Sequence, residues 1–214
     1  MDTIVGRKIR VDVGKTEGAP IAVTEVTNAK PAVASAAAHG LLNKSLGYFE
    51  NVVGMAEIEG QACRVANTAS GTFELEGLKT TSYGDYTSGS FVPVTDWATC
   101  SEITNYNIPD ATAESLDDTW LIHNQAQTIG GNLAAQDPVF TINAQQVPSE
   151  GMAIVEEAAE DGELLVFRIT YLGSGRVRFF RGQPGKPGEN VPKGQVGTGS
   201  FTVNTKGRIL RGAA

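Results

Sequence analysis

Two histidines, His39 and His123, are the residues best suited to general acid–base chemistry in this chain. A Ser-His-Asp or Cys-His site would need one of them, because imidazole titrates near neutral pH. His39 lies in a turn of small residues and His123 follows an apolar triplet, and both settings are typical of a surface or strand-edge histidine. The sequence contains no HExxH, CxxC, GxSxG or Walker pattern. We therefore expect no enzyme, although a small enzyme that uses His123 with the carboxylates of residues 110–118 stays an alternative.

Four carboxylates in a long polar stretch form a second candidate group: Asp110, Glu114, Asp117 and Asp118. Calcium takes six to eight oxygen ligands, and carboxylates supply them. The spacing of these four residues matches no EF-hand loop, and the turning glycine is absent. A solvated acidic loop is the favoured interpretation, so no metal and no cofactor are expected.

Basic residues alternate with aromatic ones near the carboxyl end, where Arg176, Arg178, Arg181 and Lys186 surround Phe179 and Phe180. Such a pattern can stack and neutralise single-stranded nucleic acid. The chain as a whole has 17 Lys and Arg against 24 Asp and Glu, a net charge of −7. Because nucleic-acid binding needs a basic face, salt bridges between subunits or a solvated strand face are the favoured interpretations.

Composition limits the class of protein further. The 214 residues include 25 glycines, which indicates many turns and short strands. No apolar run is long enough for a membrane span, and the first residues do not form a secretory signal. Two cysteines 37 positions apart, Cys63 and Cys100, are expected to be reduced thiols in a chain made in the cytosol.

The elements that would position these residues are mostly strands. Period-two alternation predicts a half-buried strand over Ile9–Val13 that ends at Gly14. Ser149 and Gly162 delimit the one good helix candidate, residues 149–161. Residues 164–180 are predicted to form a hairpin around a Gly-Ser-Gly turn, and residues 201–205 the last strand.

Residues 19–93 differ in texture from the rest and predict a small all-β module inserted into a larger body. The body would comprise residues 1–18 and 94–214, because the first strand needs sheet partners that only the later segment supplies. Within the body, residues 104–137 are expected to be a long loop and residues 182–199 a Gly/Pro-rich hairpin loop.

The inserted segment resembles a small β-barrel module that is common in structural proteins of tailed bacteriophages. That module is often described by its similarity to the first catalytic cysteine half-domain of ubiquitin-activating enzymes. The resemblance covers most of residues 21–92 and rests on Glu25–Val33, Val53–Gly60, Val65–Asn67, Thr72–Leu75 and Tyr83–Gly89. No adenylation chemistry is visible in this chain.

The remaining segments resemble a bacteriophage major tail tube protein. The similarity lies in the order of the elements: a first strand, a long loop containing Glu114–Thr119, an acidic helix at 149–161, the hairpin at 164–180 and a final strand within 200–209. This resemblance implies a mainly β fold, a tail-tube-type two-sheet sandwich or barrel with one flanking helix. It also implies homohexameric rings that stack into a hollow tube in the virion tail, assembled in the host cytoplasm.

The resemblance implies partners as well: further copies of the chain, a tape measure protein and a tail terminator, with phage DNA passing the lumen during ejection without specific binding. We expect the insert on the outer surface of a non-contractile tail, because a contractile sheath would clash with it, and we expect no membrane contact. The expected contacts between subunits or rings are Asp110, Glu114, Asp117, Asp118, Trp120, Gln183, Lys186 and Glu189.

Two alternatives stay open at this point. The chain could be a carbohydrate- or surface-binding β module with a glycan cleft built from exposed aromatic residues, for which Tyr48, Tyr83 and Tyr86 are available. It could also be another ring-forming tail protein, such as a tail terminator, which closes into rings and does not polymerise alone.

Overall fold

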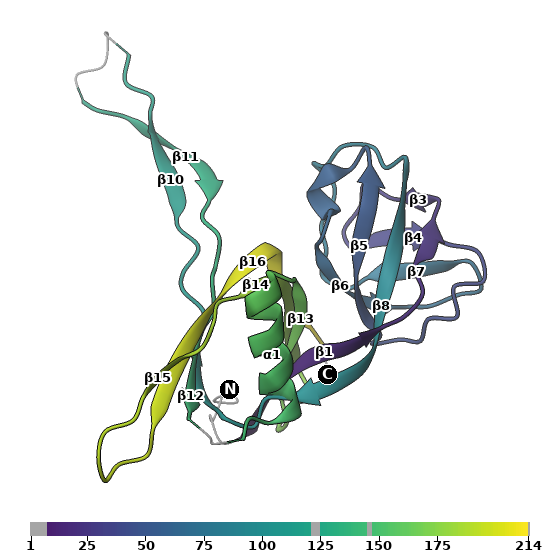
Figure 1. Ribbon diagram of the computed structural model, residues 1–214. Coiled ribbons are helices and arrows are strands. Elements are labelled where there is room, and N and C mark those ends of the chain that lie inside the picture. Colours follow the sequence, from purple (N-terminus) through teal and green to yellow (C-terminus); the bar gives the residue numbers. More distant parts are fainter. Residues whose placement is uncertain (1–7, 121–124, 145–146, 214) are drawn as a thin grey trace.

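The computed structural model describes residues 8–120, 125–144 and 147–213, and it is mainly β with one α-helix in that part of the chain (Figure 1). His123 lies outside the described residues. The strands of the amino-terminal half are β1 (Ile9–Glu17), β2 (Ile21–Val23), β3 (Glu25–Val26), β4 (Ala32–Ser35), β5 (Leu46–Val53), β6 (Ala62–Ala66), β7 (Thr72–Leu75) and β8 (Ser88–Thr99), with a short 3₁₀ turn at Ala56–Ile58. The later elements are β9 (Ile103–Asn107), β10 (Ala113–Asp117), β11 (Thr128–Leu133), β12 (Val139–Asn143), α1 (Glu150–Asp161), β13 (Leu165–Tyr171), β14 (Val177–Pro184), β15 (Gly188–Asn190) and β16 (Thr198–Gly212).

One curled, antiparallel sheet contains almost all of these strands. Its hydrogen-bonded order is β3-β4-β7-β6-β5-β8-β1-β13-β14-β16-β12-β9, with β2 paired to β8 and β15 paired to β16. The long strand β8 joins the two halves of this path, because it pairs with β5 from Ser88 to Val94 and with β1 from Val94 to Thr99. The expected mainly β class with one flanking helix is confirmed, and β10 and β11 form a small second sheet.

Two separate hydrophobic cores lie on the two halves of the sheet. The first is built from β1, β9, β12, β13, β14, β16 and α1, and its fully buried centre includes Phe140, Phe167 and Phe180. The second is built from residues 21–91 together with a contact from Leu210, and it surrounds Phe49, Phe73 and Phe91. Burial of apolar area stabilises each by roughly 1.5–3 kcal/mol per large side chain.

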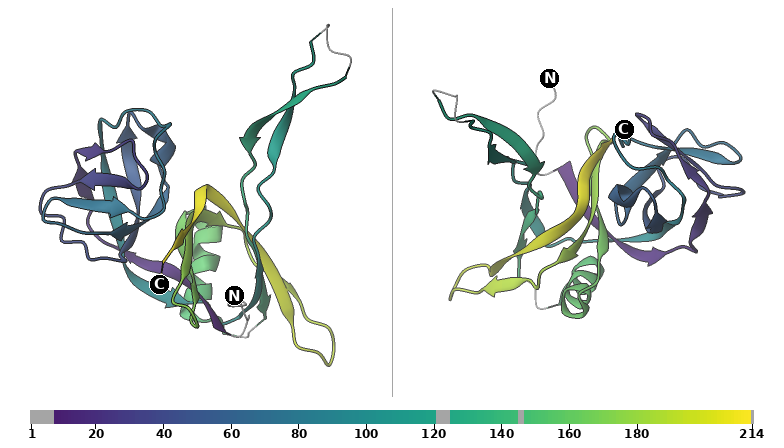
Figure 2. Two further views of the ribbon diagram at one scale, coloured as in Figure 1. Left: turned by 180° about the vertical axis from the view of Figure 1, so that it is seen from behind. Right: turned by 90° about the horizontal axis from the view of Figure 1, so that it is seen from above.

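A third cluster fills the space between the two cores. Leu46, Tyr48, Ala62, Val92 and Val94 come from residues 19–93, or from their boundary, and pack on Val166, Val177 and Phe179 of β13 and β14. The outer face of the curled sheet is therefore covered here by the residues of the first half of the chain. Figure 2 shows these two parts of the molecule in contact along β1 and β8.

The helix α1 begins and ends where its sequence predicts. The Ser149 hydroxyl accepts a hydrogen bond from the Met152 N–H, and Gly162 ends the helix with a φ of +75°, in the left-handed region. Glu102 in turn accepts bonds from the backbone N–H and the hydroxyl of Ser149, so the cap is tied to the end of β8. Met152 and Val155 face the first core, while the acidic residues face away from it.

Two sequence predictions about strand extent are wrong. The first strand does not end at Gly14 but continues to Glu17, because the edge of β8 offers it partners as far as Val94. Residues 104–137 are not a plain loop, because β9 pairs with β12 and the pair β10–β11 forms a long hairpin. The predicted helix, the hairpin of residues 164–180 and the last strand are confirmed, the last strand in a longer form.

His39 also differs from its prediction, because it is buried rather than on the surface. Only 9% of its area is exposed, its Nε2 lies 2.8 Å from the Ala69 carbonyl oxygen, and its Nδ1 accepts a bond from the Leu41 N–H. The ring packs edge-on against Phe73. Both ring nitrogens are thus occupied by backbone groups, and the residue supports the second core.

A narrow cavity separates β1 from β9, at the place where the curled sheet would close on itself. Its volume is about 170 Å³, and its lining includes Ile9–Val11, Ile103–Tyr106 and Cys100. The Cys100 N–H donates to the Val11 carbonyl directly after the last residue pair of the β1–β8 ladder, Asp12 with Thr99. Cys100 itself is 3% exposed, and Cys63 in the second core is fully buried.

We predict that Gly151→Ala destabilises the fold although alanine favours helices. A Cβ at this position would lie 2.6 Å from the Thr99 carbonyl carbon and 2.7 Å from its oxygen, so α1 would have to move away from β8. We expect a loss of about 1–3 kcal/mol in the free energy of unfolding, measured by urea denaturation. Ala153→Gly on the exposed side of α1 is the control and should cost about 1 kcal/mol or less. A more stable Gly151→Ala variant would contradict the tight packing of this turn.

We also predict that neither thiol reacts with Ellman's reagent in the folded protein at pH 8. Burial, with contributions from Glu102 and Asp12, raises the pKa of Cys100 to about 12, and burial raises the pKa of Cys63 as well. Because the thiolate is the reactive form, both should react only after unfolding in guanidinium. Leu42→Cys, at a position that is 75% exposed, is the matched control and should react within seconds. Rapid reaction of Cys100 would show that the cavity beside β1 opens, and rapid reaction of Cys63 would show that the second core opens.

Candidate subunit-contact surfaces

The hairpin β10–β11 projects from the body and has no core of its own. Among the described residues its strands pair only with each other, through Ala113–Leu133, Leu116–Ile129 and Asp117–Thr128 among others. Figures 1 and 2 show it reaching well beyond the curled sheet. Three of its apolar side chains are largely exposed, Leu116 at 42%, Ile129 at 53% and Leu133 at 65%. Such a hairpin offers apolar and backbone groups to another surface.

The five sequence-predicted contact residues from this region all lie on this arm or at its base. Asp110, Glu114 and Asp117 are exposed, Asp118 is half-buried, and Trp120 is 66% exposed near the tip. The Thr119 hydroxyl and N–H lower the pKa of Asp117, so this carboxyl stays ionised at neutral pH. Asp117 also accepts a 2.9 Å bond from the Thr119 N–H, which shapes the turn after β10.

The other three predicted contact residues lie on the second projection, formed by the end of β14, β15 and the start of β16. Gln183 and Glu189 are exposed on strands β14 and β15. Lys186 lies between these strands, and its ammonium is 2.6 Å from Glu160 of α1. The two groups of predicted residues are therefore on two different projections, and the structure does not bring them together (Figure 1).

The basic and aromatic residues of the carboxyl-terminal hairpin do not form one patch. Arg181 stacks on Tyr48 with 3.6 Å between the guanidinium carbon and the ring centroid, so it lies against the first half of the chain. Lys186 is paired with Glu160, and Phe179 and Phe180 are fully buried on opposite faces of β14. The stacking platform that nucleic-acid binding would need is absent from this hairpin.

Ionic and aromatic contacts fasten residues 19–93 to the rest of the chain. The Tyr48 hydroxyl donates a 2.9 Å bond to Glu17, and burial together with that bond raises the pKa of Tyr48. The Arg181 guanidinium of β14 stacks on the same Tyr48 ring, with 3.6 Å from its carbon to the ring centroid. These contacts give the two parts of the chain a fixed relative position.

The carboxyl-terminal strand β16 makes a second set of contacts with residues 19–93, which the local sequence pattern does not predict. Gln61 donates to the Arg208 carbonyl and accepts from the Arg208 N–H, at 3.0 and 2.7 Å. Arg64, almost fully buried, binds the Ala213 carbonyl and pairs with Glu76, whose other oxygen accepts from the Ala213 N–H. Arg64 in the otherwise apolar strand β6 and Gln61 just before that strand are the sequence signal that could have indicated a partner segment, because a polar side chain in such a strand needs a partner when buried.

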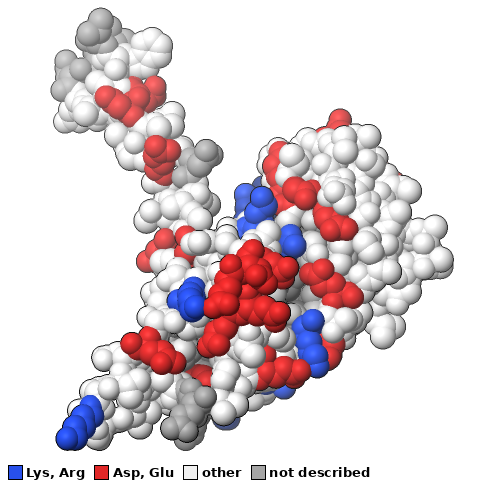
Figure 3. Space-filling view, in the orientation of Figure 1, with Lys and Arg blue, Asp and Glu red and all other residues white. Residues whose placement is uncertain are grey.

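Acidic side chains dominate the view of the surface in Figure 3, where they gather over α1. Among the described residues, no group of three or more His, Cys, Asp or Glu side chains is placed to hold a metal ion. No helix in the described ranges has the length and apolar character that crossing a membrane would require.

Comparison with known families agrees with the resemblance that the residue order suggests. The profile of the phage tail tube protein family matches residues 53–184, which is more than half of the chain. The matched segment runs from the end of β5 through the projecting hairpin and α1 to the end of β14. The search of curated proteins found no match to this chain. A profile match of this extent, on a mainly β structure with one helix and long projections, shows that the chain belongs to the phage tail tube protein family.

Proposed function

We propose that this tail tube protein forms homohexameric rings that stack into the hollow tube through which phage DNA passes during ejection. Family membership makes the chain a structural component of the virion tail that assembles with copies of itself. The observation that carries the finer proposal is the hairpin β10–β11, which projects without a core of its own. A two-stranded hairpin is at best marginally stable alone in water, so a neighbouring subunit must cover its apolar residues.

We assign the contacts between subunits and rings to the two projections. The arm supplies Asp110, Glu114, Asp117, Asp118 and Trp120, and the projection of β14–β16 supplies Gln183, Lys186 and Glu189. Exposed apolar side chains on the second projection, Val191 at 66% and Val196 at 68%, support its role as well. Obligate assemblies bury more than roughly 2,000 Å² per interface, and two long projections per subunit offer such areas.

Residues 19–93 form, in this proposal, a decoration domain inserted into a tube body of residues 1–18 and 94–214. The support is their separate core around Phe49, Phe73 and Phe91, together with their resemblance to the small β-barrel module of phage structural proteins. We place this domain on the outer surface of the tube. A contractile sheath would then clash with it, so the tail would be long and non-contractile.

The lumen would let DNA pass without binding it. The net charge of −7 repels phosphate, and residues 19–93 contain four Lys and Arg against seven Asp and Glu, so the acidic excess is not confined to one part. A tape measure protein and a tail terminator are the expected further partners, and host cytoplasm is the expected place of assembly. A tail terminator remains the second candidate from the same class, because it also closes into rings.

The glycan-binding alternative loses its aromatic platform. Tyr48 is 4% exposed and covered by Arg181, so its ring is not available to a sugar. The Tyr86 hydroxyl is bonded to the Val23 carbonyl, and burial raises the pKa of this residue to about 12. Tyr83 is half-buried and packs against the second core. The three tyrosines thus serve the folding of residues 19–93 and their contact with the body, which favours a decoration role over a glycan cleft.

Electron microscopy of the purified protein at rising concentration tests the proposal. We expect hollow tubes of stacked six-fold rings with regularly spaced knobs on the outside. Single rings that never stack would favour the tail terminator, and knobs inside the lumen would contradict the outer position of residues 19–93. A chain that stays monomeric at all concentrations, even with preformed tube ends added, would contradict the tube itself.

We predict that Ile129→Ser combined with Leu133→Ser prevents tube formation without unfolding the chain. Both side chains are more than half exposed, so the free energy of unfolding of the single subunit should change by less than about 0.5 kcal/mol. Leu42→Ser, an equally exposed leucine within residues 19–93, is the control and should assemble normally. Sedimentation measures tube formation by the arm variant and by the control, and urea denaturation measures their stability. Normal tubes from the arm variant would contradict the role of the arm.

A further inference from the structure

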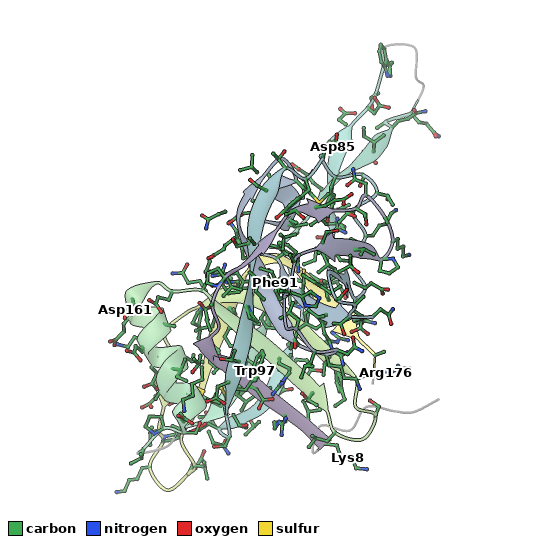
Figure 4. The ribbon with its side chains drawn as sticks, turned by 90° about the vertical axis from the view of Figure 1, so that its right-hand side faces the viewer. Lys8, Asp85, Phe91, Trp97, Asp161 and Arg176 are labelled. Carbon is green, nitrogen blue, oxygen red and sulfur yellow. The ribbon has the colours of Figure 1, made fainter. Side chains whose placement is uncertain are left out.

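Four basic side chains gather at one end of the body sheet: Lys8, Arg176, Arg178 and Arg211, which we call the basic edge. Arg178 of β14 and Arg211 of β16 are direct cross-strand partners. The Tyr171 N–H donates to the Arg176 carbonyl, and the Leu172 N–H donates to the Lys8 carbonyl. Arg176 and Lys8 therefore both lie beside the turn between β13 and β14. Figure 4 shows Lys8 and Arg176 at the same lower end of the molecule.

These four cations have no acidic partner within the described part of the chain. The ion pairs found there involve Arg10, Lys15, Arg64, Arg168 and Lys186, and none involves the basic edge. Lys8, Arg176 and Arg211 are exposed and Arg178 is half-buried. Like charges directly opposite on neighbouring strands repel each other, so the Arg178–Arg211 pair is unfavourable in the isolated subunit. An anionic partner would relieve this repulsion.

The projecting arm has the complementary charge. Residues 108–136 contain Asp110, Glu114, Asp117 and Asp118 and not a single Lys or Arg. Glu114 and Asp118 accept no side-chain hydrogen bond among the described residues, so their charge is not already satisfied within the arm. The arm is therefore a purely acidic strand pair that also exposes apolar side chains.

The two charged features lie at opposite ends of the subunit. Figures 1 and 4 share the vertical direction; the arm rises to the top, whereas Lys8 and Arg176 lie near the bottom in Figure 4. The arm therefore turns away from the basic edge of its own chain. Two different surfaces that meet head to tail form a heterologous contact, which repeats along a stack.

We propose that the acidic arm of one subunit docks on the basic edge of a subunit in the next ring, and that this contact sets the stacking of rings. This inference rests on the proposed tube and specifies its axial contact. The occupant of the basic edge is thus a second copy of this chain. Electrostatic complementarity of this kind selects the partner and its orientation more than it adds affinity.

Charge reversal on either side tests the contact. The arm variant is Glu114→Lys with Asp118→Lys, and the edge variant is Arg176→Glu with Arg211→Glu. None of these four residues takes part in an ion pair within the described part of the chain. We expect each variant alone to raise the protein concentration needed for tubes by about tenfold or more in 0.1 M salt. The two variants mixed, and the chain carrying all four changes, should recover tubes because opposite charges face each other again.

The control reverses two acids elsewhere, Glu157→Lys with Asp161→Lys on the exposed side of α1. It has the same change in net charge as the arm variant and should form tubes at nearly the wild-type concentration. An equal loss in the control, or no recovery in the mixture, would overturn the contact and leave the proposed tube intact.

A second measurement does not depend on variants that assemble. A zero-length carbodiimide reagent joins carboxylates to lysine. Wild-type tubes are made from mixed light and ¹⁵N-labelled chains, so that a link between a light and a labelled peptide identifies a contact between two subunits. We expect such a link between Lys8 and a carboxylate of residues 110–118. Tubes that form without that link would overturn the docking surface. A wild-type chain that never forms tubes would instead contradict the proposed function, and this contact with it.

Discussion

The pairing of strand β8 with partners on both sides is the constraint on which the rest of the structure depends. Its first half adds to β5 and its second half to β1, so the hydrogen bonds of one sheet pass from one hydrophobic core to the other. Strand β1 ends at Glu17, and the N–H of the next residue, Gly18, donates to the Pro93 carbonyl of β8. This bond lies where β8 passes from its pairing with β5 to its pairing with β1. Residues 19–93 are therefore joined to the rest of the chain by continuous sheet and not by a flexible tether.

Side chains reinforce this junction at two further places. Val177 and Phe179 of the body are covered by Leu46, Tyr48 and their neighbours, and the last residues of β16 depend on β6 for their partners. Removing residues 19–93 would uncover those apolar residues and leave the chain end unbound. A deletion that fails to assemble would then report a damaged body as well as a missing decoration, so exposed point substitutions are the cleaner test.

The sequence alone predicts correctly those elements that have one buried face. The helix at 149–161 and the hairpin of residues 164–180 show clear periodicity because each packs against the first core. The sequence predicts a loop where the arm lies because both faces of the arm are exposed, and polar–apolar alternation appears only where one face of a strand is buried. The length of β1 depends on the distant edge of β8, and the burial of His39 depends on Phe73, so neither could be recognised from local pattern.

The candidate contacts show the same division between local and distant information. The polarity of residues 104–118 and the Gly/Pro content of residues 182–199 identified both projections from the sequence, but not that Lys186 is already paired with Glu160. The basic edge joins β1, β14 and β16, segments up to 203 positions apart between Lys8 and Arg211, and only the curled sheet brings them together. Because the acidic arm and the basic edge lie at opposite ends of the subunit, each head-to-tail contact leaves a free arm at one end and a free edge at the other, so the same contact can repeat along a stack.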